Sequence, residues 1–315
     1  MAESKPTTPE FRTALVLWNW TDESEELQTI PPSDKDFVEL GKAFAQCGLS
    51  AQFVNLEDKI ERIDHALAVH RPAVVCNLVD HFRGDETAHS LVAAYLELKE
   101  VSFTGCDAAC MSNCQDRVYT RLALQELGVQ VPGFVVLRDA SEIPDLSKLV
   151  PPLHVSQSYE DTYYSEESEV EGPESVSAKV EELFEDFELP FLVEEQKPGK
   201  RLATVVIGRE KPEVLPVCEI EDLWTAKPAE LTPALLEQAH SSALKAFRCF
   251  GCEDLALVEF ALSDSGDLHC INVRPVFAPF SENGPFRIGL GSRNQSVFGE
   301  IAKMTARAAG ITITK

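Results

Sequence analysis

The chain has 315 residues, 44% of them hydrophobic and 25% charged, values typical of a globular protein with two or three domains. Aspartate and glutamate number 52 against 28 lysines and arginines, a formal net charge of −24. Such an acidic chain is not expected to bind nucleic acids or anionic membranes, which need a cationic protein surface. No apolar run approaches the roughly 18 residues that cross a bilayer. Nine cysteines without a secretion signal favour free thiols in a reducing cytoplasm.

The first third of the chain alternates between apolar runs and segments with apolar residues at helical spacing. Strands are expected at 13–20, 51–56, 73–79 and 101–104, and helices at 37–47, 60–70 and 91–98. This alternation is typical of a parallel sheet covered by helices. The sequence therefore predicts an N-terminal α/β domain over residues 12–107.

Residues 108–189 are expected to form a small central domain. A helix is predicted at 110–127 and a strand at 134–137. The stretch 157–188 carries 12 acidic residues and one basic residue, a net charge of −11. We expect an acidic loop at 157–177, mobile from Tyr159 to Ser177, followed by a helix at 178–187, because the first part has few apolar side chains and the second has them at helical spacing.

Residues 190–315 are expected to form a third unit with a mainly antiparallel sheet. Strands are predicted at 191–196, 201–208, 214–220, 255–262 and 268–273, and helices at 235–250 and 297–309. The segment Ser-Asp-Ser-Gly-Asp at 263–267 is a strong hairpin signal between two of these strands.

Two groups of cysteines could bind a soft metal. Cys249 and Cys252 form a single CxxC half-motif, and Cys106, Cys110 and Cys114 recur at every fourth position. For both groups we favour a structural role, with the three spaced thiols packing a helix against a sheet, and a metal or redox role remains the alternative.

Three stretches, in this order, resemble the D-alanine–D-alanine ligase branch of the ATP-grasp superfamily. They are Asn77–Gly105 with Asp116–Pro132, then Pro190–Gly208, and finally Cys252–Pro275. The resemblance covers nearly the whole chain. It implies a three-part ATP-grasp fold, α/β and α+β, with a parallel-sheet N-terminal domain, a small central domain and a C-terminal domain whose sheet is mainly antiparallel.

The chemistry of this family sets what its site must contain. ATP phosphorylates a carboxylate and an amine then attacks the acyl phosphate, so cationic side chains hold the phosphates and acidic ones hold Mg²⁺. By the resemblance, Arg117 and Arg121 replace two lysines near the phosphates. Glu194, Glu195 and Lys197 stand at the hinge that binds adenine. These five residues are the expected nucleotide site.

Several positions depart from the family's pattern. Ser156 replaces a phosphate lysine, and Arg201 replaces a ribose-binding glutamate. The glycine-rich phosphate loop becomes SYEDTYYSEESEVEG, whose negative charge repels a triphosphate. Leu257 stands in place of the arginine that stabilises the oxyanion.

The expected metal ligands are also altered. By the resemblance they are Glu259 and Asn272, but the first is lengthened from aspartate and the second has changed from a carboxylate to an amide. Arg274 occupies a third ligand position. Because Mg²⁺ prefers carboxylate oxygens, this set is poor. Arg274 could instead serve as a relocated catalytic group for the oxyanion or phosphate.

Two hypotheses follow. The favoured one is a pseudoenzyme without cofactor that acts as a binding or regulatory protein, with a protein partner or as a homodimer. The alternative is an active ATP- and Mg²⁺-dependent carboxylate–amine ligase with a divergent site. The side chain of Arg274 discriminates between them. It pairs with Glu259 or an acidic-loop carboxylate in the first, and in the second it lies with Glu259 in an open cleft shared with Glu194 and Arg121.

Overall fold

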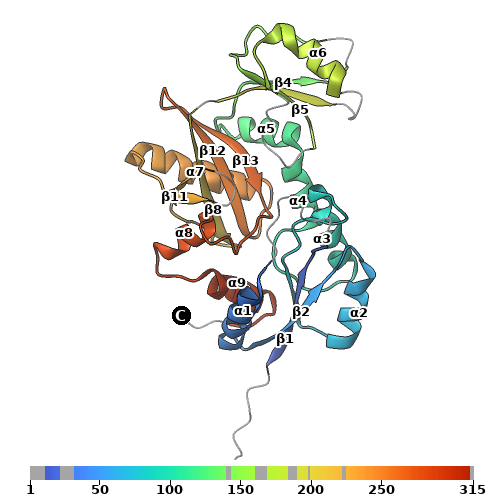
Figure 1. Cartoon of the computed structure of the whole chain (residues 1–315). Helices are drawn as coiled ribbons and strands as arrows, with labels where there is room; N and C mark the ends of the chain where they lie inside the picture. Colours follow the sequence, from blue (N-terminus) through green and yellow to red (C-terminus); the bar gives the residue numbers. More distant parts are fainter. Residues whose placement is uncertain are drawn as a thin grey trace, which may run out of the picture.

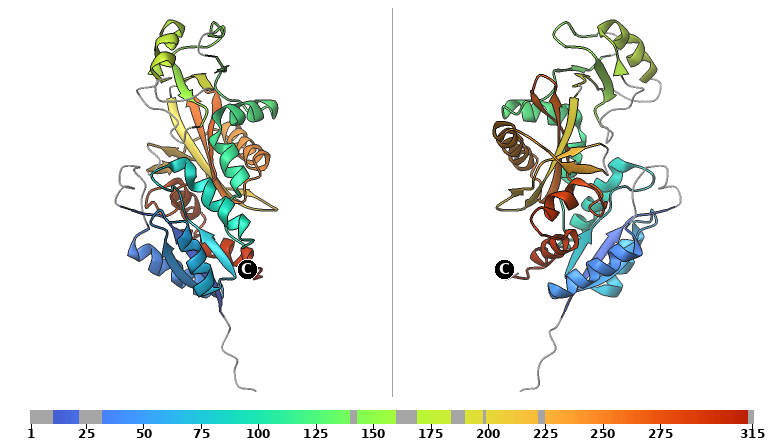
Figure 2. Two further views of the ribbon diagram at one scale, coloured as in Figure 1. Left: turned by 90° about the vertical axis from the view of Figure 1, so that its right-hand side faces the viewer. Right: turned by 60° about the vertical axis from the view of Figure 1, so that its left-hand side comes forward.

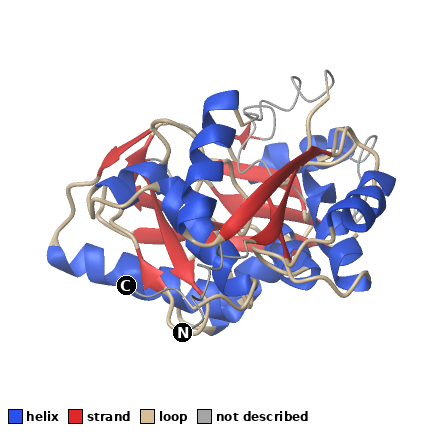
Figure 3. Cartoon of the chain, turned by 90° about the horizontal axis from the view of Figure 1, so that it is seen from below, coloured by secondary structure: helices blue, strands red, loops and turns tan. Residues whose placement is uncertain are grey.

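The computed structural model describes residues 11–21, 32–139, 143–159, 169–183, 190–197, 199–221 and 225–312. These residues form a column of three sheets, with a parallel sheet at one end, a large antiparallel sheet in the middle and a small antiparallel sheet at the other end (Figures 1 and 2). Seen from below, helices surround the strands (Figure 3). The described part of the chain contains no helix long and apolar enough to span a membrane.

The N-terminal sheet is parallel, with the strand order β2-β1-β3. Its elements are β1 (Arg12–Trp18), α1 (Asp34–Gln46), β2 (Leu49–Asn55), α2 (Glu61–His70), β3 (Val74–Asn77) and α3 (His89–Leu98). The central strand β1 is buried on both faces, since Ala14 and Val16 pack into one apolar cluster while Leu15 and Leu17 pack into another. The predicted strand at 101–104 is reduced to a single parallel bridge between Phe103 and Val75.

The helix predicted at 110–127 is wrong in one respect, because the structure divides it. α4 (Ala108–Gln115) and α5 (Arg117–Glu126) meet at Asp116, whose backbone is extended. The Asp116 carboxylate accepts hydrogen bonds from the backbone N–H of Tyr119, at 2.9 Å, and from the hydroxyl of Ser158, at 2.6 Å. Asp116 thus caps α5, and this capping leaves the spacing of the apolar residues unchanged.

The middle sheet has the order β11-β10-β8-β12-β13, with β9 also paired to β8. Its strands are β8 (Gly199–Gly208), β9 (Glu213–Val214), β10 (Cys218–Ile220), β11 (Ala226–Pro228), β12 (Asp254–Ser263) and β13 (Leu268–Arg274). The predicted hairpin of β12 and β13 is confirmed. The strand predicted at 214–220 is instead two short strands on either side of Pro216, which has no N–H to donate to a sheet.

Helices cover both faces of the middle sheet. α7 (Pro233–Cys249) packs on one face, where its Ala243 and Phe247 join Val206 and Val258 in an apolar cluster. α8 (Pro285–Gly291) and α9 (Val297–Ala308) cover the other face. Because alternate residues of a strand face opposite ways, β8 contributes to both clusters.

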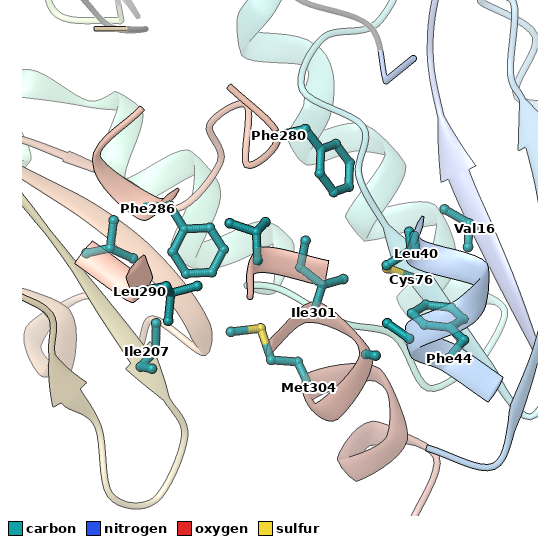
Figure 4. Packing of buried hydrophobic residues seen from close by; sticks show 14 of the residues in the cluster. Val16, Leu40, Phe44, Cys76, Ile207, Phe280, Phe286, Leu290, Ile301 and Met304 are labelled. Atoms are coloured by element: carbon teal, nitrogen blue, oxygen red, sulfur yellow. The ribbon is translucent and has the colours of Figure 1, made fainter. Parts of the chain in front are cut away.

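The C-terminal helix α9 also connects the middle sheet to the N-terminal one. Ile301 and Met304 of α9 lie between Phe44 of α1 and the side chains of Ile207 and Leu290 (Figure 4). One continuous apolar cluster therefore joins the start and the end of the described chain, and it fixes the middle sheet against the N-terminal layer.

The small sheet has the order β4-β7-β5-β6. Its elements are β4 (Phe134–Leu137), β5 (Leu153–Gln157), β6 (Glu169–Val170), α6 (Pro173–Leu183) and β7 (Phe191–Glu195). The prediction of a mobile acidic loop is wrong for residues 169–177, because β6 pairs with β5 and α6 begins at Pro173. The rest of that stretch from 160 to 168, and residues 184–187 of the predicted helix, lie outside the described residues.

Two buried valines explain why this acidic segment forms a strand and a helix. Val170 and Val176 are buried in the core of the small sheet, where Val180 of the next helical turn joins them. Their acidic neighbours Glu169 and Glu174 are exposed. The high charge of the segment is therefore compatible with a packed helix, because it is confined to the exposed side.

We expect Val176→Ala to lower the free energy of unfolding by about 1–3 kcal/mol, since it removes two methyl groups from a fully buried position. The matched control is Val150→Ala, the same substitution at a side chain that is 63% exposed. Urea denaturation measures both. Equal midpoints for the two variants would contradict the packing of this segment.

Candidate functional site

Most of the residues predicted to bind nucleotide and metal lie in or beside two buried networks of ion pairs. One lies on the small sheet and α5, and the other lies on the middle sheet. The buried members are Arg117, Arg121, Ser156 and Glu194 in the first and Glu259 and Arg274 in the second. Each network has a glutamate at its centre with an arginine on either side of it.

Glu194 on β7 is the centre of the first network. Arg117 donates from Nη2 to Glu194 Oε1, and Arg121 donates from Nε to Oε2 at 2.8 Å. The two arginines lie one turn apart on α5 and so face the same way. Arg117 also donates from Nη1 to the hydroxyl of Ser156, at 2.8 Å. Both cations expected to hold phosphates are therefore bound to the carboxylate expected to hold adenine.

The charges of this network outweigh the cost of burying it. Burial acts to raise the pKa of Glu194, but the positive charges of Arg121 and Arg117 hold that pKa below its usual value. Glu194 is therefore ionised at neutral pH, although its side chain is fully buried. Breaking either of these buried ion pairs is energetically unfavourable, because the released guanidinium loses its partner.

His154 on β5 completes the buried surroundings of Glu194. It is fully buried and faces Glu194 across the sheet register. Burial lowers the pKa of His154 to about 3, with the positive charge of Arg117 acting in the same direction. The imidazole is therefore neutral at physiological pH.

The protonation of His154 makes stability depend on pH. Below about pH 6.5 the unfolded chain takes up a proton on this imidazole while the folded chain does not, so acidification destabilises the fold. From about pH 7 to about pH 5 we expect His154 to account for a loss of about 2 kcal/mol. Guanidinium denaturation at both pH values measures this loss.

His154→Gln should remove most of that loss, whereas His65→Gln, at an exposed position on α2, should retain it. If the His154 variant kept the full wild-type loss between the two pH values, the buried neutral imidazole would be contradicted.

Glu259 on β12 is the centre of the second network. The neighbouring strands β8 and β13 each bring an arginine to it. Arg201 donates from Nη2 to Glu259 Oε2 at 2.9 Å, and Arg274 donates from Nε to Oε1 at 3.2 Å. Asn272 accepts a hydrogen bond from the backbone N–H of Val273, at 2.8 Å, through its side-chain oxygen. Arg274 thus pairs with Glu259, as the pseudoenzyme hypothesis predicts.

This arrangement does not fit Mg²⁺. The ion needs oxygen ligands in octahedral geometry at about 2.0–2.1 Å. Both carboxylate oxygens of Glu259 face guanidinium groups, and the Asn272 oxygen is engaged by the backbone. A divalent cation would have to displace two positive charges before it reached its ligand. The described residues therefore offer no prepared Mg²⁺ site at the predicted position.

The two networks are neighbours in space. Cys270 on β13 is fully buried, and this burial raises the pKa of its thiol to about 12. The charges of Arg121 and Glu259 both act on that thiol, the first lowering its pKa and the second raising it. Both networks therefore lie near enough to this thiol to act on it electrostatically.

Glu195 and Lys197, predicted at the adenine hinge, form a separate structural contact. Glu195 accepts hydrogen bonds from the backbone N–H groups of Val150, at 2.8 Å, and Gly133, at 3.0 Å, and it pairs with Lys197. A Cβ at Gly133 would lie 2.9 Å from Glu195 Oε1, so a larger residue there would push the carboxylate out of this position. The Glu195 side chain thus joins two loops of the small sheet.

Sequence reasoning missed the partner of Arg201 and the burial of His154. The position of Arg201 was recognised as unsuited to ribose, but its pairing with Glu259 depends on the register of β8 against β12. Opposite charges on strands that pair are the signal that could have found it. His154 lies between Leu153 and Val155 in β5, and these apolar neighbours could have indicated its burial.

Comparison with known proteins agrees with this architecture. No family model matches the chain. An uncharacterized protein of Sinorhizobium fredii, y4sG, is 27% identical over 212 residues, 61% of this chain and 62% of that protein. The D-alanine–D-alanine ligase of Thermoanaerobacter pseudethanolicus is 25% identical over 222 residues, 60% of this chain and 59% of the ligase. The chain thus spans about three fifths of the length of these curated relatives.

Solved structures match over almost the whole chain. The D-alanine–D-alanine ligase of Bacillus anthracis, in a complex with ATP, superimposes with a TM-score of 0.70 at 14% identity, over 95% of this chain and 97% of that one. The VanG D-Ala:D-Ser ligase of Enterococcus faecalis gives a TM-score of 0.67 at 15% identity, over 95% and 99%. The chain therefore has the three-part ATP-grasp fold. The predicted resemblance to D-alanine–D-alanine ligases is confirmed.

Proposed function

We propose that this D-alanine–D-alanine ligase-like chain has lost the ligase reaction and acts as a binding or regulatory protein. The observation that carries the proposal is the position of Glu259 between Arg201 and Arg274. In the predicted role this glutamate is the surviving carboxylate ligand of Mg²⁺. In the structure its two oxygens are bound to two guanidinium groups.

Releasing Glu259 for a metal ion is costly. Its side chain is fully buried and that of Arg274 is nearly so. Separating a buried ion pair leaves an uncompensated charge, with a typical cost of about 3–5 kcal/mol. Mg²⁺ binding would have to offset this cost and then hold the ion through one carboxylate and one amide. Such a site is weak before ATP is considered.

The phosphate-binding cations are held in the same way. Arg121 is 1% exposed, and both it and Arg117 are bound to Glu194. A triphosphate could recruit them only by displacing that carboxylate, which would then itself be buried without a partner. The two networks therefore oppose nucleotide and metal binding together.

The alternative, an active carboxylate–amine ligase, is supported by the curated relatives that are named as D-alanine–D-alanine ligases. In that case Arg117 and Arg121 would hold phosphate and Glu194 to Lys197 the adenine. Glu259 and Asn272 would hold Mg²⁺, and Arg274 would face the reacting group. This function requires both networks to open when ATP binds.

The surroundings of the chain follow from its composition. From its nine cysteines we infer a cytoplasmic protein, and from its net charge of −24 one that binds another protein or a second copy of itself and neither nucleic acid nor membrane. A basic protein surface is the complement that this charge favours.

Calorimetric titration with ATP and Mg²⁺ tests the proposal. We expect no Mg²⁺-dependent binding of ATP tighter than a Kd of about 1 mM, equivalent to about −4 kcal/mol, because the ligands of both groups are engaged in ion pairs. Micromolar, Mg²⁺-dependent binding by the wild-type chain would contradict the proposal and favour the active ligase.

A double variant distinguishes a lost site from a wrong alignment. Asn272→Glu with Arg274→Asn returns the ligase pattern to β13, and we expect it to strengthen Mg²⁺-dependent ATP binding. The control is Lys227→Asn, which removes an exposed cation from β11 in the same sheet. A folded double variant that binds no better than this control would contradict the assignment of Glu259 and Asn272 to the old metal site.

A further inference from the structure

Four buried cysteines meet where the N-terminal layer joins the middle sheet. Cys106 precedes α4, Cys110 and Cys114 lie on successive turns of α4, and Cys252 lies between α7 and β12. Each is at most 5% exposed. The fold thus brings together thiols that are more than 130 residues apart in sequence, since Cys110 and Cys252 are separated by 142 positions.

The positions of the sulfur atoms match a metal site. The Sγ atoms of Cys106, Cys110 and Cys252 all lie within 4.8 Å of one another. Cys110 Sγ and Cys252 Sγ are 3.6 Å apart. Cys114 is buried one helical turn after Cys110 on α4. In a tetrahedral Zn²⁺ site with Zn–S distances of about 2.3 Å, neighbouring sulfur atoms are about 3.8 Å apart. The thiols of Cys106, Cys110 and Cys252 are therefore close to this geometry.

We propose that Cys106, Cys110 and Cys252, with Cys114 as the fourth ligand, form a structural Zn²⁺ site. Thiolates are soft ligands that select Zn²⁺ over Mg²⁺ or Ca²⁺. Four protein ligands close the coordination sphere, so the site is structural and not catalytic. This site is independent of the proposed loss of the ligase reaction.

One backbone donor favours a metal-bound thiolate at Cys106, and an ion-pair network holds the segments of the cluster together. The backbone N–H of Glu253 donates to Cys106 Sγ at 3.3 Å, and such donors to sulfur stabilise metal-bound thiolates. Arg209 lies next to this segment, where it pairs with Glu253 and Asp254. The carboxylate of Asp254 in turn accepts from the backbone N–H of Gly105, at 2.9 Å. The segments that carry Cys106 and Cys252 are therefore already held together.

The alternative roles of these cysteines make different predictions. The CxxC motif suggests a pair of Cys249 with Cys252, but Cys249 is exposed and lies outside the cluster. A purely packing role, which the sequence analysis favoured for the α4 thiols, needs no metal. It also gives no reason for a fourth thiol from a distant segment to join the three.

A bound ion would connect the elements that carry both charge networks. α4 leads directly into α5, which carries Arg117 and Arg121. Cys252 lies just before β12, which carries Glu259. The ion would therefore link α4, and through it α5, to the segment that enters β12.

Cobalt substitution tests the site in the full-length chain. Co²⁺ is added to the reduced protein without oxygen, and thiolate charge-transfer and tetrahedral d–d bands are recorded. We expect saturation at one equivalent and displacement of the bands by one equivalent of Zn²⁺. Cys252→Ala should weaken binding at least about 100-fold. The matched control Cys249→Ala, three residues away in the same motif, should bind like the wild type.

Thermal unfolding of the wild-type chain supplies a second measurement in case the ligand variants fail to fold. Zn²⁺ should raise the Tm of the reduced protein, and a chelator should reverse the increase. Absence of cobalt bands in the reduced chain would overturn the proposal. So would loss of binding in Cys249→Ala with retention in Cys252→Ala, or formation of a Cys110–Cys252 disulfide in air by a reduced chain that binds no metal.

Discussion

The interaction on which the site depends is a buried carboxylate held between two arginines, and the structure contains it twice. Glu194 lies between Arg117 and Arg121, and Glu259 lies between Arg201 and Arg274. Each carboxylate is fully buried. Such a group is stable only while it is paired, because a buried carboxylate that loses its arginines carries a charge without compensation. The first network therefore fixes α5 to β7 of the small sheet, and the second fixes β8 and β13 to β12 of the middle sheet.

The fold explains why these networks persist. Glu259 is in the second strand from the edge of the middle sheet, so neighbouring strands on both sides can each supply an arginine. That sheet is in turn fixed to the N-terminal layer by the apolar cluster around α9. The cysteine cluster lies at this same junction of layers, between α4 and β12. The chain keeps the ATP-grasp fold. The charged side chains that the resemblance assigns to phosphate and metal binding form ion pairs with one another.

Much of the fold could be predicted from the sequence, because strands and helices with strong apolar patterns reveal themselves locally. The β12–β13 hairpin and the parallel sheet are examples. The break at Asp116 was missed because capping leaves the apolar spacing unchanged. The order of residues 169–177 was missed because the charge of that segment hid two buried valines, Val170 and Val176.

The site was less accessible to sequence reasoning, for a different physical reason. Family resemblance assigns residues to the site only as a proposal, and the pairing of Arg274 with Glu259 was one of two stated outcomes. The pairing of Arg201 depends on a strand register over 58 positions, and the cysteine cluster depends on contacts over 142. The spacing of Cys106, Cys110 and Cys114 is visible in the sequence, but the approach of Cys252 to them and of Arg201 to Glu259 is not. Long-range contacts of this kind decide which charges are available for a ligand and which are not.

The most direct measurement is a crystal structure of the chain grown with Mg²⁺ and a non-hydrolysable ATP analogue at millimolar concentration. We predict that the guanidinium groups of Arg201 and Arg274 remain on Glu259, with no metal ion on that carboxylate. A structure in which both arginines have turned away and Glu259 coordinates Mg²⁺ beside the bound triphosphate would contradict it.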